Sequence, residues 1–200
     1  MKLFSHKEFS TKEQQLIDIF EDVRDNWKFY LPKNIKDCSH TCVHKHEVLK
    51  HYLEQAGYRA KNIAVKFKWS NQTFPPNVKK HLNKFNDDEY HFFLQVELDG
   101  HLQNIDCTFE KTFIKYNKWN TKEPTKIAVK QYGNIIYDEE AEEKVKLYQT
   151  REFWESRLET TINFYNSANK FFEILKKTPG PAKFITQKAF EYFERKGVEE

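Results

Sequence analysis

The chain has 200 residues, with 33 Lys and Arg against 30 Asp and Glu, which gives a formal net charge of +3. This length is typical of one domain, or of one domain with an appendage. Near-balanced charge without a dense Lys or Arg block argues against nucleic-acid binding. No apolar stretch approaches the roughly 20 residues of a membrane span, and we find no pattern typical of a signal peptide. We therefore expect a cytoplasmic protein whose three cysteines are reduced.

Two helices are predicted in the first part of the chain. The first opens with a capping box at residues 10–13 and ends at Pro32. The second is expected from about Thr41 to Ala56, because Gly57 follows it at the position of a C-terminal cap. The first helix has an apolar face at regular helical spacing, made of Leu16, Phe20, Val23, Trp27 and Tyr30.

Strands are predicted in the middle of the chain. Residues 62–69 alternate between apolar and polar side chains, which indicates a strand with one buried face. Residues 70–88 form a long loop, with a short helix expected after Pro76. Further strands are expected at Tyr90–Leu98 and His101–Phe109, joined by a turn at Asp99 and Gly100, and around Lys126–Gln131 and Asn134–Tyr137.

The remainder is predicted to be helical. A heptad-like apolar stripe runs from Trp154 to Leu175, and a last helix is expected at 182–196. The order of the elements indicates an α+β domain over residues 1–137 with a helical extension over residues 138–200. Such a stripe most often packs within its own chain, but a dimer or a partner protein bound through it is a further hypothesis.

The expected hairpin brings two chemically useful residues together. A two-residue turn at 99–100 pairs Leu98 with His101, and by the same register His91 and Asp106 are diagonal neighbours on one face. A carboxylate there could accept the imidazole N–H, which would fix the tautomer and raise the basicity of the ring. A three-residue loop would instead place the two side chains on opposite faces.

Cys42 is the natural third member of this group. It lies at the predicted start of a helix, where unpaired N–H groups and the helix dipole favour a thiolate. Cys42, His91 and Asp106 would then act as nucleophile, base and orienting group, with the amide of Cys42 as one oxyanion donor. Each residue alone has a more ordinary role, as a small core residue, a surface histidine or a turn residue.

Several spacings resemble a known family. Cys42 is followed fifteen residues later by the segment GYRAK at residues 57–61, which leads into a predicted strand. His91 and Asp106 are also fifteen residues apart, with a turn between them, and the sequence VRDNWKFY precedes the cysteine at residues 23–30. Over about residues 12–110 the chain resembles the transglutaminase-like superfamily of papain-like fold enzymes.

The resemblance implies a papain-like core, in which the nucleophile helix packs on an antiparallel sheet. It implies a thiol-dependent amidase, protease or transglutaminase-type acyltransferase that acts on a peptide or protein amide through a thioester. The catalytic triad would be Cys42, His91 and Asp106, and no cofactor would be needed. An upstream tryptophan is thought to help hold the oxyanion in this family, which makes Trp27 a candidate, although its helical position favours core packing. The family usually has glycine where this chain has His40, so an inactive member is an alternative.

Two other functions stay open at this point. A catalytically inactive domain of the same fold could bind a partner protein through its aromatic C-terminal helices. Alternatively, Cys38, Cys42 and His46 are spaced by four residues and could bind zinc, although Cys38 precedes the helix and no second pair of ligands follows. Cys38 is also a second candidate nucleophile, and Cys107 is expected to be buried.

Overall fold

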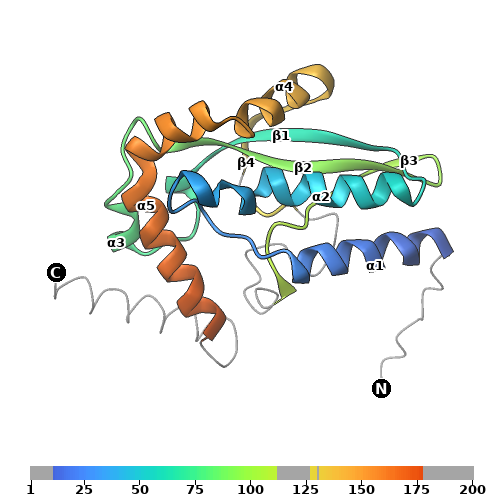
Figure 1. Ribbon diagram of the computed structural model, residues 1–200, viewed down its shortest axis with the longest axis horizontal. Coiled ribbons are helices and arrows are strands. Elements are labelled where there is room, and N and C mark those ends of the chain that lie inside the picture. The colour runs from blue at the N-terminus through green and yellow to red at the C-terminus, as the bar shows by residue number, and fades with distance from the viewer. Residues whose placement is uncertain (1–10, 112–126, 130, 178–200) are drawn as a thin grey trace.

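The computed structural model describes residues 11–111, 127–129 and 131–177 of the chain. Its centre is a curled antiparallel sheet of four strands in the order β3-β2-β1-β4, with helices packed against it (Figure 1). The α+β class is therefore confirmed, while the papain-like core stays a prediction. The strands are β1 (Ala60–Lys68), β2 (Asp88–Leu98), β3 (His101–Ile105) and β4 (Gln131–Ile136). The helices are α1 (Thr11–Asn26), α2 (Cys42–Gln55), α3 (Pro76–Lys79), α4 (Asp138–Tyr148) and α5 (Arg151–Lys177), with 3₁₀ turns η1 (Ile35–His40) and η2 (Trp69–Asn71).

The β2–β3 hairpin has the predicted two-residue turn. Leu98 pairs with His101, and the same register continues along both strands. Asp99 and Gly100 have φ angles of 49° and 76°, and a type I′ turn needs such left-handed values at both central positions. The Asp-Gly pair therefore sets the register that brings the two ends of the hairpin together.

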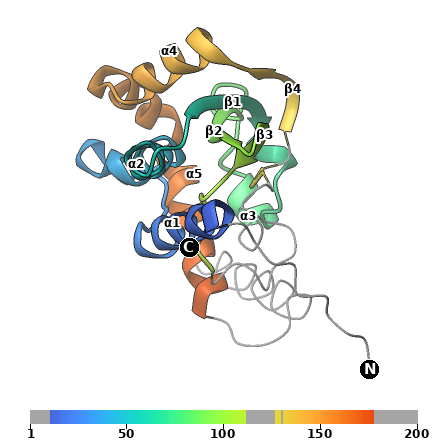
Figure 2. The same ribbon diagram turned by 90° about the vertical axis from the view of Figure 1, so that its right-hand side faces the viewer.

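Helix α2 lies against the sheet and next to α1 (Figure 2). Leu49 and Leu53 of α2 are fully buried and share an apolar cluster with Leu94 and Val96 of β2. Burying such a side chain stabilises the fold by about 2 kcal/mol, so this cluster fixes α2 on the sheet. Gly57 has a φ angle of 86° and ends the helix as predicted.

Helix α1 is shorter than predicted. It ends at Asn26, so Trp27 leaves the apolar face and is 40% exposed, and the prediction that Trp27 packs in the core is wrong. The reason is tertiary hydrogen bonding, because the amides of Phe29 and Leu31 donate to side chains from distant parts of the chain. The predicted capping box at residues 10–13 begins outside the described residues.

Two strands differ from their prediction. β1 is buried on both faces, because α4 covers the side that carries Asn62 and Ala64, which are 1% and 0% exposed. β4 is one continuous strand over Gln131–Ile136, where two short strands were expected. Residue 126, the start of the first of these, lies outside the described residues.

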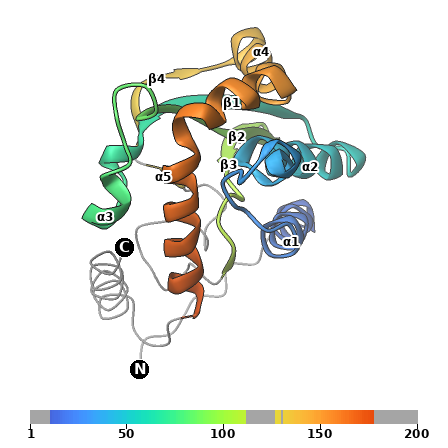
Figure 3. The same cartoon turned by 60° about the vertical axis from the view of Figure 1, so that its left-hand side comes forward.

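Helices α4 and α5 share one core with the sheet. The predicted apolar stripe on α5 is largely buried, in the same cluster as Phe67 of β1 and Phe92 of β2. Figure 3 shows α5 extending from α4 past one end of the sheet. The stripe is therefore occupied within the chain and is not free for a dimer or a partner protein. The predicted helix at 182–196 lies outside the described residues, and within those residues no helix is long and apolar enough to cross a membrane.

Candidate active site

Cys42 is the first residue of α2, and its side chain is partly exposed. The N–H groups in the first turn of a helix have no partners inside the helix, and the helix dipole favours negative charge there. Thr41, which precedes it, has an extended backbone and is buried. Cys42 thus occupies the position that the sequence predicts for a nucleophile.

His91 of β2 and Asp106, the first residue after β3, form a buried pair. Nε2 of His91 lies 2.7 Å from Oδ2 of Asp106. The carboxylate also accepts hydrogen bonds from the amide and hydroxyl of Thr108 at 3.0 and 2.7 Å, and from the amide of Ala128 at 2.7 Å. Because so many donors hold the carboxylate in one orientation, it in turn fixes the orientation of the imidazole.

The surroundings of the pair shift both pKa values. Burial lowers the pKa of His91, but the charge and hydrogen bond of Asp106, together with a smaller effect of the nearby Cys42, outweigh it and raise the pKa to about 9. Burial raises the pKa of Asp106, but the charge of His91 outweighs it and holds the pKa well below its ordinary value. At neutral pH the pair is therefore an imidazolium and a carboxylate, and an imidazolium stabilises a neighbouring thiolate.

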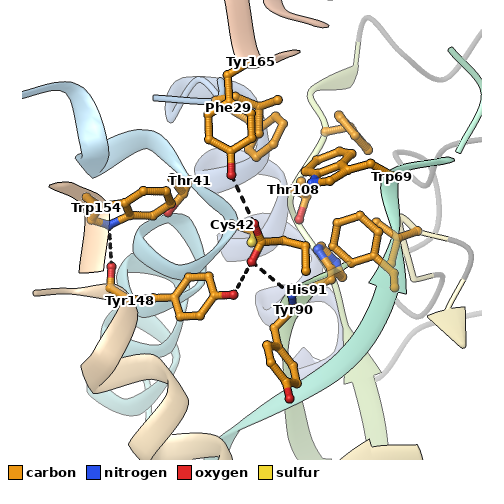
Figure 4. A pocket seen from close by; sticks show the side chains of 15 residues that line it. Phe29, Thr41, Cys42, Trp69, Tyr90, His91, Thr108, Tyr148, Trp154 and Tyr165 are labelled. Carbon is orange, nitrogen blue, oxygen red and sulfur yellow. Dashed lines mark hydrogen bonds between the residues drawn. The ribbon is translucent and has the colours of Figure 1, made fainter. Parts of the chain in front are cut away.

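Cys42 and His91 line the same cavity. Nε2 of His91 is used by Asp106, which leaves Nδ1 as the ring nitrogen available to a neighbouring group. Figure 4 shows Cys42 and His91 at the centre of a ring of aromatic side chains. The structure thus places the ion pair of His91 and Asp106 beside Cys42, as the sequence predicts.

A small cavity of about 50 Å³ adjoins Cys42 and His91. Its walls are mostly apolar and come from both ends of the described chain. Among the residues that line it are Phe29, Phe67, Trp69, Tyr148, Trp154 and Tyr165.

A buried ion pair joins α5 to the sheet beside the cavity. Glu89 of β2 is 7% exposed and accepts hydrogen bonds from Arg157 at 3.0 and 2.7 Å. It also accepts from the hydroxyl of Tyr165 at 3.1 Å and from that of Tyr148 (Figure 4). Burial and the charge of Glu89 raise the pKa of both tyrosines, so they stay protonated and donate. The cluster therefore fixes two aromatic walls of the cavity.

Trp69 offers a hydrogen-bond donor that the described protein atoms do not use. It is 7% exposed and lines the cavity, and within the described part of the chain its Nε1 has no hydrogen-bond partner. Figure 4 shows its ring beside Thr108, on the wall opposite Trp154. Trp154, by contrast, donates from Nε1 to the carbonyl oxygen of Tyr148 at 2.7 Å. A buried N–H without a partner costs about 1–3 kcal/mol, so a ligand oxygen placed beside Trp69 would be stabilised.

Three residues considered from the sequence are not part of this site. Trp27 does not line the cavity, so the structure does not bring this oxyanion candidate to Cys42. Cys38 is buried, and burial followed by the charge of Asp37 raises the pKa of its thiol to about 11, which makes it a poor nucleophile. His40 stacks on the ring of Tyr30, with the ring centroids 4.3 Å apart.

The zinc alternative is not supported by the geometry. Nδ1 of His46 lies 2.8 Å from the carbonyl oxygen of Cys42, and its Nε2 accepts a hydrogen bond from the amide of Cys107 at 3.0 Å. Neither ring nitrogen is therefore available to a metal ion. Among the described residues no group of three His, Cys, Asp or Glu side chains could hold a metal ion.

Sequence reasoning missed most of the cavity wall. Trp69 and Tyr165 had a usable signal, because one ends the alternating strand pattern and the other lies on the apolar stripe of α5. Glu89 had none, since a glutamate in the run NDDEYH suggests a solvated turn. Only the packing of α5 against β2 places it beside the cavity.

No protein-family model matches this chain, and comparisons with curated proteins and with solved structures give no significant match. The similarity to transglutaminase-like enzymes therefore rests on the residues and spacings within about residues 12–110 alone.

Proposed function

We propose that the chain is a transglutaminase-like cysteine enzyme, which transfers or hydrolyses an acyl group through a thioester on Cys42. The observation that supports this most is that Cys42 and His91 line one cavity, with His91 held by a buried hydrogen bond to Asp106. A cysteine with a purely structural role does not need a partly exposed thiol. It also does not need an ion-paired histidine and a cavity next to it. Together these are the parts of a nucleophile, a base and an orienting group.

The reaction on an amide would proceed in two halves. The Cys42 sulfur attacks the carbonyl carbon, a C–S bond forms, and the carbonyl electron pair moves to oxygen. When the tetrahedral intermediate collapses, the C–N bond breaks and the imidazolium of His91 gives its proton to the leaving amine. Water or a second amine then attacks the thioester, His91 takes a proton from it, and the C–S bond breaks to restore the thiolate. Asp106 stays ionised and orients His91 throughout.

Two donors are suited to the oxyanion of this reaction. One is the backbone amide of Cys42, at the start of α2. The other candidate is Nε1 of Trp69, a residue that lines the same cavity and whose N–H has no partner among the described residues. An oxyanion would supply the missing acceptor, so the hydrogen bond would form as negative charge develops.

The size and polarity of the cavity favour some classes of substrate over others. The cavity is small, which suits an acyl group of side-chain size better than a stretch of polypeptide backbone. Mostly apolar walls favour an uncharged acyl group. We therefore expect chemistry at a small or side-chain amide in preference to cleavage within a peptide backbone.

Trapping the acyl-enzyme tests the proposal. The protein is mixed with p-nitrophenyl acetate, a small activated acyl donor, and its intact mass is followed by mass spectrometry beside a Cys42→Ser variant. We expect a rapid mass increase of one acetyl group on Cys42 only, which decays in water and decays faster with an added primary amine. Acetylation that is equally fast in Cys42→Ser, or no acetylation at all, would contradict the proposal.

A further inference from the structure

His46 is a histidine that the proposed reaction does not use, although it lies next to every residue of the triad. It is one helical turn after Cys42 on α2 and is 0% exposed. Its ring stands at 89° to the ring of His91, with the centroids 6.2 Å apart. It is not among the residues that line the cavity, so it has no route to a substrate.

The two ring nitrogens of His46 contact backbone atoms of two different segments. Nδ1 lies 2.8 Å from the carbonyl oxygen of Cys42. Nε2 lies 3.0 Å from the amide nitrogen of Cys107. The contact with the carbonyl needs a proton on Nδ1, and the contact with the amide N–H needs the lone pair of Nε2. One side chain therefore bridges the backbone of the nucleophile and the backbone next to Asp106. Burial lowers the pKa of His46, but its interactions with Cys107 and Asp106 outweigh burial and raise the pKa well above its ordinary value.

This bridge supplies directional contacts that the apolar packing of α2 does not. Leu49 and Leu53 hold α2 on the sheet through non-directional burial, which would tolerate small sliding movements of the helix. Hydrogen bonds at both ring nitrogens fix the distance between the first turn of α2 and the chain after β3. Nε2 of His46 is also 3.4 Å from Oδ1 of Asp106, so the ring fills the space behind the carboxylate.

We propose that His46 is a positioning residue for the triad, which holds the Cys42 turn at a fixed distance from the Asp106–His91 pair. This inference rests on the proposed function, because it concerns the geometry of the same reaction. A displacement of about 1 Å at a reacting centre lowers a rate by about 10²-fold. His46 would then influence the rate of acylation without touching the substrate.

The test compares variants at His46 with a matched variant on the same helix. His46→Leu removes both hydrogen bonds at similar volume, whereas His46→Gln and His46→Asn each keep an amide that can replace one of them. His44→Leu is the control, because within the described part of the chain the ring of His44 has one hydrogen bond, to the side chain of Thr41. For each protein, kcat and KM with p-nitrophenyl acetate are measured, together with the rate of Cys42 alkylation by iodoacetamide from pH 5 to pH 10.

We expect kcat to fall by about 10²-fold in His46→Leu, with KM little changed and with Cys42 alkylation near neutral pH slowed as well. Part of the loss should be recovered in His46→Gln or His46→Asn, and His44→Leu should resemble the wild type. A merely structural role would lower the melting temperature but leave kcat and the alkylation profile of each folded molecule unchanged, and that result would overturn the proposal. If His46→Leu does not fold, the same comparison is made with the Gln and Asn variants, and wild-type kcat in both would overturn it.

The proposed function can fail separately. If Cys42 of the wild type is neither acylated nor alkylated faster than an ordinary thiol, there is no triad to position and both proposals fall. If the wild type is reactive but all His46 variants match it, the inference about His46 alone is wrong.

Discussion

The imidazole of His91 and the carboxylate of Asp106 meet at 2.7 Å in a buried part of the molecule, although one belongs to the start of β2 and the other follows β3. The contact uses Nε2 of the ring and leaves Nδ1 available to Cys42, which lines the same cavity as His91. The pair is therefore both a link between two segments of the hairpin and the base of the proposed reaction.

The first prediction concerns stability against pH. The pKa of His91 is about 9 in the folded protein and about 6.5 in an unfolded chain. Because the folded value is the higher one, the stabilisation is complete below about pH 6.5 and is lost as the pH rises through about 9. The free energy of unfolding, measured by urea titration, should fall across this window by up to about 3 kcal/mol.

The variant His91→Gln provides the comparison, because glutamine does not titrate. It should be less stable than the wild type at pH 6 and should show a much smaller decline between pH 6.5 and pH 9. Equal slopes for the two proteins would contradict an ion pair between His91 and Asp106.

The second prediction concerns the unused donor of Trp69. In Trp69→Phe the N–H is removed and no internal hydrogen bond among the described residues is lost. We expect the rate of acylation by p-nitrophenyl acetate to fall by about 10²-fold, as for the loss of one oxyanion donor. Stability should fall by less than the effect of the smaller ring, because the substitution also removes a buried N–H without a partner, which costs about 1–3 kcal/mol.

Trp154→Phe is the matched control on the opposite wall of the cavity. It removes the same ring volume and also the hydrogen bond from Nε1 to Tyr148, so it should lose about 1 kcal/mol more stability than Trp69→Phe and keep more of the acylation rate. Similar kinetics in the two variants would mean that the Trp69 N–H does not bind the oxyanion.

The third prediction concerns the cluster around Glu89. Glu89→Gln leaves the Arg157 guanidinium without its buried carboxylate and turns an amide N–H toward other donors. Removing one partner of a buried ion pair destabilises a protein by about 3–5 kcal/mol, and we expect a loss of this order in urea titration. Glu155→Gln, which removes an exposed partner of Arg151, should leave the unfolding midpoint unchanged. Equal midpoints for both variants would show that the Glu89 cluster does not hold α5 on the sheet.

The local part of the site could be predicted from the sequence because turn chemistry and strand periodicity act over short distances. Asp99 and Gly100 favour a two-residue turn, and this turn alone determines that His91 and Asp106 lie on the same face. Gly57 likewise marks the end of α2, and the position of Cys42 at its start follows from the length of the helical pattern.

The rest depends on contacts between segments that are far apart in the sequence. The end of α1 is set by hydrogen bonds from the amides of Phe29 and Leu31 to Glu110 and Asn169, so Trp27 could not be placed from helical spacing. The cavity wall needs α5 to cross the sheet, and Glu89 becomes part of it only through Arg157. No local pattern encodes such partners.

The most direct test of the proposed triad is the rate of Cys42 alkylation by iodoacetamide as a function of pH, resolved by mass spectrometry for each of the three cysteines. We expect Cys42 to react much faster than Cys38 and Cys107 near neutral pH, because its thiol is partly exposed beside the imidazolium of His91 whereas the other two are buried. In His91→Ala the reactivity near neutral pH should be lost, and alkylation should become fast only at alkaline pH. If Cys42 in the wild type already shows the pH dependence of an ordinary thiol and His91→Ala leaves it unchanged, the thiolate–imidazolium pair does not exist and the proposed enzyme function is contradicted.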